Sequence, residues 1–270
     1  ETAAIDNADV IVWPESAIAA LEYEVIDFLH DLDGQLLNKQ QALITGVIAH
    51  DLQSNQYYNA LITLGQQTKE AGASSAYYYE NPNRYYKNHL LPIGEFVPFE
   101  QLLRPLAPFF NLPMSSFNRG DTMQQNLEVK GHQWLAAICY EIAFGELLRP
   151  QFTPETDAII TVSNDAWFGT SIGPQQHLEI AQMRALEFGR PVLRSTNTGV
   201  TAIIDRFGNI QQRAPEYQQL ALTGDVTPAM GTTPYQRFGL WPMALVVLLG
   251  LSTGLLTRLR QRLLNPAANN

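Results

Sequence analysis

Cysteine is almost absent from this sequence, because Cys139 is the single cysteine among 270 residues. One cysteine excludes an internal disulfide but leaves the redox compartment open, since a protein outside the cytoplasm need not contain disulfides. A Walker loop, a Gly-x-Gly-x-x-Gly turn and a Cys-x-x-Cys pair are also missing. The sequence therefore carries none of the common motifs for nucleotide binding or dithiol chemistry.

Basic residues are scarce as well. The chain has 17 Lys and Arg against 26 Asp and Glu, which gives a formal net charge of −9. Because nucleic-acid binding needs a basic surface, we expect no nucleic-acid partner. Metal-ligand spacing is missing from the histidines, so we expect no metal site and no cofactor and interpret all five as surface or core residues: His30, His50, His89, His132 and His177.

Acidic residues are missing from the C-terminal part of the chain, where none follows Asp225. Twenty uncharged residues, 238–257, lie between two arginines of this part. At about 1.5 Å per residue, a helix of that length spans about 30 Å, the thickness of the hydrocarbon core of a bilayer. This run predicts a transmembrane helix over residues 237–257. The alternative is a buried helix of a soluble protein.

The flanking charges predict the orientation of that helix. Arg258, Arg260 and Arg262 follow it, and the positive-inside rule then places residues 258–270 in the cytoplasm. The acidic body, residues 1–236, is expected on the opposite side of the membrane. Because the chain opens without a methionine or a signal peptide, we expect an N-terminally truncated protein whose missing part directs it to the membrane.

Apolar, β-branched runs predict an α/β fold. Most of the runs are continuous, as in strands covered on both faces. Helical periodicity predicts helices over 16–37 and 175–188, and strands interleaved with helices indicate the α/β class. Turns at 198–199 and 207–209 predict that the later strands form antiparallel hairpins. The predicted strands cover residues 8–13, 42–49, 58–65, 133–138, 157–163, 191–196, 200–205 and 220–226.

Residues 80–120 interrupt this pattern, because they are rich in proline and aromatic residues and show no clear period. A long irregular segment inside a compact domain is usually functional. Two apolar stretches within it, 96–99 and 106–114, are candidates for a lid or a bilayer contact. Ordinary packing on the domain is the alternative.

The position of Cys139 suits a nucleophile. It follows the predicted strand 133–138 and precedes residues 141–150, which have the pattern of a helix. The oriented N–H groups and the positive dipole end at a helix N-terminus stabilise a thiolate. An inert thiol is the alternative, because free cysteines are among the most buried residues.

Two further residues favour the nucleophile. Glu15 also ends a predicted strand and precedes a predicted helix, where α/β folds gather catalytic groups. Lys87 is the single lysine between Lys69 and Lys130 and lies among aromatic residues. Taken singly, they are better explained as a helix-start carboxylate and a solvated loop lysine. Glu, Lys and Cys in this order form a much more specific pattern.

Four motifs carry a resemblance to a known family: VWPES, YYKNHLLPIGEFVPF, ICYEIAF and the stretch from VSNDAWFG to IIDRFG. They resemble the nitrilase, or carbon-nitrogen hydrolase, superfamily and, within it, the apolipoprotein N-acyltransferases of bacterial inner membranes. The resemblance covers nearly all of residues 8–257. It implies a nitrilase-like αββα sandwich on the periplasmic side, followed by one C-terminal transmembrane helix. That family also carries membrane helices upstream, so the full-length protein is expected to be multi-pass.

The resemblance assigns roles residue by residue. It implies a Glu-Lys-Cys triad in which Glu15 is the general base, Lys87 the oxyanion stabiliser and Cys139 the nucleophile. The segment 164–169 is expected to shape the pocket wall. Glu95 is a supporting residue that is expected either to hold the lysine or to transfer protons. Tyr140 and Glu141 match further positions that the family requires.

The implied function is lipoprotein maturation by N-acyl transfer. An acyl chain moves from a membrane phospholipid, through a thioester on Cys139, to the α-amino group of an N-terminal S-diacylglyceryl-cysteine, with ping-pong kinetics. The expected partners are the phospholipid donor, the diacylglyceryl apolipoprotein acceptor and the membrane itself, and the enzyme is expected to be a monomer. Two alternatives are a hydrolase of a small amide or nitrile and a catalytically inactive, membrane-tethered binding domain.

Overall fold

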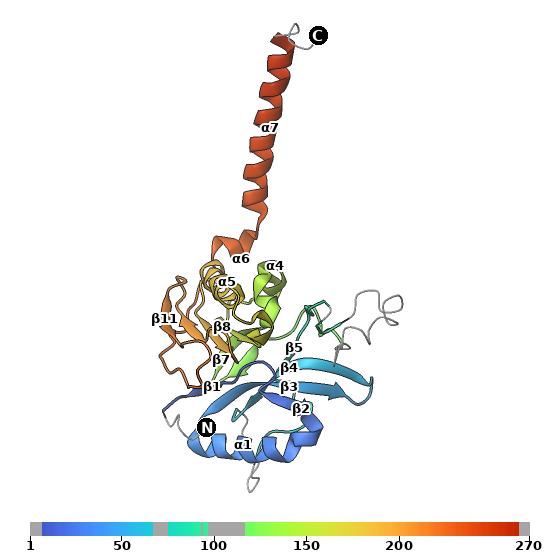
Figure 1. Ribbon diagram of the computed structural model, residues 1–270, viewed down its shortest axis with the longest axis vertical. Coiled ribbons are helices and arrows are strands. Elements are labelled where there is room, and N and C mark those ends of the chain that lie inside the picture. Colours follow the sequence, from blue (N-terminus) through green and yellow to red (C-terminus); the bar gives the residue numbers. More distant parts are fainter. Residues whose placement is uncertain (1–6, 67–74, 93, 97–116, 265–270) are drawn as a thin grey trace.

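The computed structural model describes residues 7–66, 75–92, 94–96 and 117–264. Within this part of the chain two β-sheets lie face to face, and helices cover their outer faces (Figure 1). This arrangement is the αββα sandwich that the resemblance implies, so the expected fold class is confirmed.

The first sheet has the strand order β1-β3-β4-β5, with β2 paired to the same strand as β1. Its centre is an antiparallel hairpin, and the two N-terminal strands run parallel to the first strand of that hairpin. The strands are β1 (Val10–Val12), β2 (Ile18–Leu21), β3 (Ala42–Asp51), β4 (Gln56–Leu64) and β5 (Arg84–Tyr86).

The second sheet has the order β11-β10-β9-β8-β7-β6. Its three central strands are parallel and its outer strands antiparallel, and the last two pair as the predicted hairpin. The strands are β6 (Leu127–Val129), β7 (His132–Ile138), β8 (Thr156–Ser163), β9 (Val192–Thr196), β10 (Ala202–Ile204) and β11 (Ile210–Arg213).

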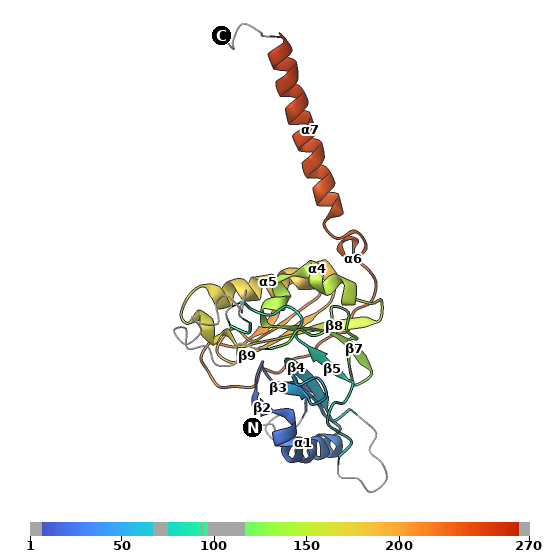
Figure 2. The ribbon, with the colours of Figure 1, turned by 90° about the vertical axis from the view of Figure 1, so that its right-hand side faces the viewer.

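Helices close the sandwich on both sides. Helix α1 (Ile26–Lys39) lies on the first sheet, whereas α4 (Gly145–Leu148) and α5 (Gly173–Phe188) lie on the second (Figure 2). Short 3-10 turns join several elements: η2 (Glu22–Val25), η4 (Cys139–Ala143), η5 (Arg149–Gln151) and η6 (Asp165–Phe168).

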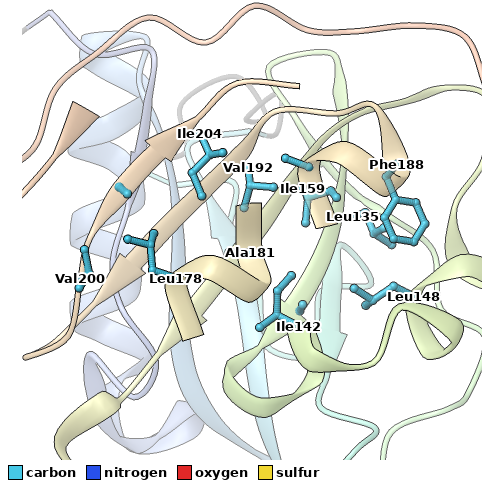
Figure 3. Packing of buried hydrophobic residues seen from close by; sticks show 13 residues of the cluster. Leu135, Ile142, Leu148, Ile159, Leu178, Ala181, Phe188, Val192, Val200 and Ile204 are labelled. Carbon is cyan, nitrogen blue, oxygen red and sulfur yellow. The ribbon is translucent and has the colours of Figure 1, made fainter. Parts of the chain in front are cut away.

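Alternation along the central strands sorts side chains between the layers. In β8, Ile160 and Val162 pack between the two sheets, whereas Ile159 points to the opposite face. On that face Leu178 and Ala181 of α5 cover the sheet (Figure 3). Because both faces of these strands are buried, their sequences are continuously apolar, as the apolar runs predict.

The helix predicted over residues 16–37 is wrong for residues 16–25. Residues 18–21 form β2 and pair with β3, with Ile18 opposite Val47, and the helix begins only at Ile26. Ser16 has a φ of 53°, which excludes a regular helix start there. Pairing with a buried neighbouring strand therefore overrides the helical period of this segment.

Three further predictions differ from the structure. Residues 220–226 form no strand and lie largely exposed, so they lack the sheet neighbour that an apolar run needs. Residues 141–150 form short helical turns rather than one helix. The irregular segment contains β5, while the two apolar stretches proposed as a lid lie outside the described residues apart from Phe96.

The C-terminal part projects away from the sandwich (Figure 2). Helix α6 (Pro234–Phe238) ends at Gly239, whose φ is 56°, and α7 (Trp241–Leu264) follows. Residues 241–258 of α7 are apolar, long enough to cross a bilayer and not buried against the protein. The helix thus begins four residues after the predicted start at residue 237, because Gly239 breaks the chain direction.

Candidate active site

Three segments distant in sequence bring Glu15, Lys87 and Cys139 together. Glu15 lies in the turn between β1 and β2, Lys87 directly follows β5, and Cys139 directly follows β7. The Lys87 Nζ is 3.2 Å from the Glu15 Oε1. The charges of both residues act on the Cys139 thiol. The structure therefore gathers the three residues that the sequence singles out.

A close approach of two backbones positions Glu15. At Gly46 of β3 a Cβ atom would lie 2.6 Å from the Ser16 nitrogen, so only glycine lets the turn carrying Glu15 lie against this strand. The buried carboxylate accepts hydrogen bonds on both oxygens. Oε1 accepts from the Asn59 Nδ2 at 2.8 Å, and Oε2 accepts from the Asn164 N–H at 2.8 Å.

Lys87 is almost completely buried between two carboxylates. Its Nζ lies 2.9 Å from the Glu95 carboxylate in addition to its contact with Glu15. Asn59 donates to both carboxylates, and its carbonyl oxygen accepts the Lys87 N–H at 2.8 Å. The Leu91 N–H holds the second oxygen of Glu95 at 2.8 Å. These contacts fix the ammonium in one place.

The charge of Lys87 is secured by the same neighbours. Burial alone would lower the pKa of Lys87, but the Glu15 and Glu95 carboxylates raise it well above its ordinary value. The side chain is therefore an ammonium at neutral pH. A fixed positive charge in a site that excludes water suits the stabilisation of an oxyanion.

The backbone of Cys139 adopts a conformation that is uncommon for a residue with a side chain. Its φ is 54°, in the left-handed region, at the junction between β7 and η4. Such strain clusters at functional sites, because the surrounding structure must enforce it. The side chain of Cys139 is half-buried.

The expectation of a thiolate at a helix N-terminus is wrong. Cys139 is the first residue of a 3-10 turn of five residues rather than of an α-helix, and burial together with the Glu15 charge raises the pKa of Cys139 to about 12. The Lys87 charge and a hydrogen bond with Ser163 oppose this rise but do not cancel it. The resting thiol is neutral at neutral pH, so it must lose its proton to a base during reaction.

The raised pKa predicts the pH profile of thiol alkylation. Because Cys139 is the single cysteine, iodoacetamide uptake, measured by intact mass, reports on it alone. We expect the alkylation rate to rise about tenfold per pH unit from about pH 7 to about pH 10, since only the thiolate reacts. A plateau beginning near pH 8, as for an ordinary thiol, would contradict the assigned environment.

Glu141 connects the segments that carry Lys87 and Cys139. Its fully buried carboxylate accepts the N–H groups of Asn88, His89 and Ile138 at 2.8, 2.9 and 2.8 Å. The hydroxyl of Tyr85 donates to it at 3.1 Å. Although burial raises the pKa of Glu141 to about 6, the acid still ties the residues after Lys87 to those before Cys139.

Replacing Glu141 with leucine is expected to lower the free energy of unfolding by about 3 kcal/mol or more, because three buried backbone N–H groups lose their acceptor. Urea denaturation measures the change. Glu128→Leu is the matched control, since Glu128 is exposed on β6 and its substitution should leave stability nearly unchanged. Equal stability of the two variants would contradict the connecting role.

The other predicted residues lie at the edge of this group. Tyr140 is exposed, and its ring packs edge-on against Phe144 with centroids 4.8 Å apart. In the segment 164–169, the backbone of Asn164 reaches Glu15, Asp165 is buried, and Trp167 is 74% exposed. Among the described residues no group of three or more His, Cys, Asp or Glu could hold a metal ion.

Reasoning from the sequence misses two residues. Asn59 holds both carboxylates, and the available signal is a polar residue inside the apolar run of β4. His177, interpreted as an ordinary surface or core histidine, has its Nε2 3.1 Å from the Cys139 carbonyl oxygen. Its helical spacing to Ala181 places it on the buried face of α5, which gives a weak signal.

Several proteins with related sequences match this chain. The chain is 52% identical over 237 residues to the apolipoprotein N-acyltransferase of Photobacterium profundum, covering 88% of this chain and 45% of that protein. It is 52% identical over 248 residues to the apolipoprotein N-acyltransferase of Vibrio cholerae, covering 92% and 48%. The chain thus spans about half the length of the curated relatives it matches.

Solved structures share the fold at low sequence identity. An amidase from Nesterenkonia sp. matches with a TM-score of 0.58 and 15% identity over 87% of this chain and 82% of that chain. Nit3 of Saccharomyces cerevisiae, a nitrilase-superfamily member, matches with a TM-score of 0.54 and 17% identity over 81% and 76%. The sequence profile described as carbon-nitrogen hydrolase matches residues 1–235. This chain therefore belongs to the carbon-nitrogen hydrolase family.

Proposed function

We propose that this chain carries the catalytic part of an N-acyltransferase that completes the maturation of bacterial lipoproteins. The donor is a membrane phospholipid, and the acceptor is the α-amino group of the N-terminal S-diacylglyceryl-cysteine of an apolipoprotein. The observation that carries the proposal is the close group of Glu15, Lys87 and Cys139. It occurs in a chain whose sequence is 52% identical to those of two apolipoprotein N-acyltransferases over the matched residues.

In the first half-reaction Cys139 takes the acyl chain. Glu15 accepts the thiol proton as the sulfur attacks the ester carbonyl, which the raised pKa of the thiol makes necessary. The Lys87 ammonium stabilises the oxyanion that forms, and one such donor contributes about 10²–10³ in rate. The ester C–O bond then breaks, a C–S bond remains, and Glu15 returns the proton to the departing lysophospholipid.

In the second half-reaction the acyl chain leaves the sulfur. The α-amino group of the acceptor attacks the thioester carbonyl and loses a proton to Glu15. A C–N bond forms, the C–S bond breaks, and the proton passes from Glu15 to the Cys139 sulfur. Because one substrate leaves before the other reacts, the kinetics are ping-pong.

The remaining residues support this cycle without touching the reacting atoms. Glu95 holds the Lys87 ammonium and balances its charge, and Glu141 keeps the two segments of the site together. Tyr140 contributes an exposed ring beside Cys139, where a substrate arrives. Both substrates are lipids, so water must be kept from the thioester to prevent hydrolysis.

The long apolar helix suits an enzyme of lipid substrates. We propose that α7 crosses the bacterial inner membrane, with residues 1–236 as a catalytic domain in the periplasm and the arginines after residue 257 in the cytoplasm. The sequence predicts the span at residues 237–257 and the cytoplasmic tail at residues 258–270, because Arg237 and Arg258 flank the uncharged run. We propose that the full-length protein crosses the membrane several times and that it acts as a monomer.

A transfer assay tests the function. The purified protein in phospholipid vesicles receives a peptide with an N-terminal S-diacylglyceryl-cysteine, and mass spectrometry follows the peptide. We expect one acyl chain in amide linkage, and none on a matched peptide whose amine is acetylated or with the variant Cys139→Ala. Release of ammonia from soluble amides without lipid, with no acylated peptide, would instead assign a hydrolase.

A further inference from the structure

A buried charged cluster lies directly behind Cys139 and takes no part in the proton transfers described above. Its members are Asp165 of η6, His177 of α5 and Arg194 of β9, each at most 6% exposed. The Arg194 Nη2 is 2.6 Å from the Asp165 Oδ2 and 3.1 Å from the His177 Nδ1. The His177 Nδ1 also lies 3.2 Å from the Asp165 Oδ1.

The cluster contacts the nucleophile through its backbone. The His177 Nε2 is 3.1 Å from the carbonyl oxygen of Cys139. A carbonyl oxygen can only accept a hydrogen bond, so the Nε2 of His177 must carry a proton. The bond therefore fixes the peptide unit that follows the left-handed residue, whose φ of 54° needs support from its surroundings.

The rest of the cluster fixes His177 in turn. Burial alone would raise the pKa of Asp165, but its contact with His177, the Arg194 charge and the Ser163 hydroxyl hold it below its ordinary value. The Nε of Arg194 donates to the Val200 carbonyl oxygen at 3.1 Å. At Gly199 a Cβ atom would lie 2.1 Å from the Asp165 Oδ2, so this carboxylate has no room to move.

We infer that Asp165, His177 and Arg194 form a positioning group that holds the Cys139 peptide in its left-handed conformation and so aims the sulfur at the acyl donor. His177 acts through the backbone of Cys139 and is a positioning residue. The consequence for lipid transfer rests on the proposed function, whereas the consequence for acylation of the thiol does not.

Two amide substitutions separate this role from a general contribution to stability. The Nε2 of glutamine in His177→Gln lies where the Nε2 of the imidazole was and can donate to the Cys139 carbonyl. The shorter side chain in His177→Asn places its amide where the Nδ1 of the imidazole was, next to Asp165. It therefore leaves the Cys139 carbonyl oxygen without its donor. Both variants introduce the same chemical group at the same buried position, so folding alone should not distinguish them.

The readout is acylation of the purified protein by p-nitrophenyl acetate, followed as the burst of p-nitrophenolate. We expect His177→Gln to retain the burst rate to within about tenfold, because the donor to the Cys139 carbonyl is kept and only the Nδ1 contact with Asp165 is lost. We expect His177→Asn to slow it about 100-fold, because the sulfur is displaced from its attacking position. His132→Asn, at the far end of β7, is the control and should leave the rate unchanged.

Equal burst rates for the two amide variants, whether normal or slow, would overturn the inference. Urea denaturation confirms that each variant is folded. If His177→Asn does not fold, Asp165→Asn decides, since a normal burst rate in that variant also overturns the positioning role. A wild-type protein that gives the burst but no N-acylated peptide would reject the proposed function and leave the positioning group standing.

Discussion

Replacing Lys87 with methionine is expected to give the largest combined loss of activity and stability in this chain. The substitution removes the one cation between Glu15 and Glu95, whose carboxylates lie 3.2 and 2.9 Å from the Lys87 Nζ. Both carboxylates are buried and share Asn59 as a donor, so their charges would be left uncompensated. Breaking a buried ion pair in this way costs about 3–5 kcal/mol of stability.

The same variant loses the proposed oxyanion donor. We expect the rate of thioester formation to fall by about 10²–10³-fold or more. Adding Glu95→Gln to Lys87→Met should recover part of the lost stability, because one uncompensated charge disappears, and should recover none of the activity. Urea denaturation and the acylation rate of the two single variants and the double variant measure both effects. Unchanged stability of Lys87→Met would contradict the buried charge arrangement.

Replacing Glu15 with glutamine is expected to change two reactions of one thiol in opposite directions. Acyl transfer should fall by about 10²–10⁴-fold, because the general base is lost. Alkylation of Cys139 by iodoacetamide near pH 8 should become faster. The Glu15 charge raises the pKa of Cys139, so its removal lowers that pKa and increases the thiolate fraction while the Lys87 ammonium remains.

Intact mass spectrometry after timed exposure to each reagent follows both reactions of the Glu15→Gln variant. Glu128→Gln, at an exposed position on β6, is the matched control and should change neither rate. A parallel fall of acyl transfer and alkylation would mean that Glu15 holds the site together without acting as its base.

The sequence predicts those elements whose own residues carry a clear hydrophobic pattern. The continuous apolar runs of β3, β4, β7 and β8 predict strands buried on both faces, and the structure places each between two layers. Lys87 and Cys139 directly follow strands, and Glu15 lies in the turn between β1 and β2. For Glu15 and Cys139 the sequence indicates a position after a strand. The sequence indicates only an irregular segment around Lys87, because β5 has only three residues.

Contacts between distant segments account for what the sequence does not predict. Asn59 reaches Glu15 across 44 residues, and His177 reaches Cys139 across 38 residues, so no spacing rule brings either pair together. The strand at residues 18–21 depends on pairing with β3 rather than on its own periodicity. The thiolate expectation fails because burial and the Glu15 charge outweigh the donors near Cys139, and burial is a property of the folded protein.

The most direct test of the account is the mass of the purified protein after exposure to phospholipid without an acceptor. We predict an increase equal to one acyl chain, located on Cys139, removed by hydroxylamine as a thioester is, and absent from Cys139→Ala. An unchanged mass of the wild-type protein, or the same adduct on Cys139→Ala, would contradict the claim that this thiol carries the acyl group.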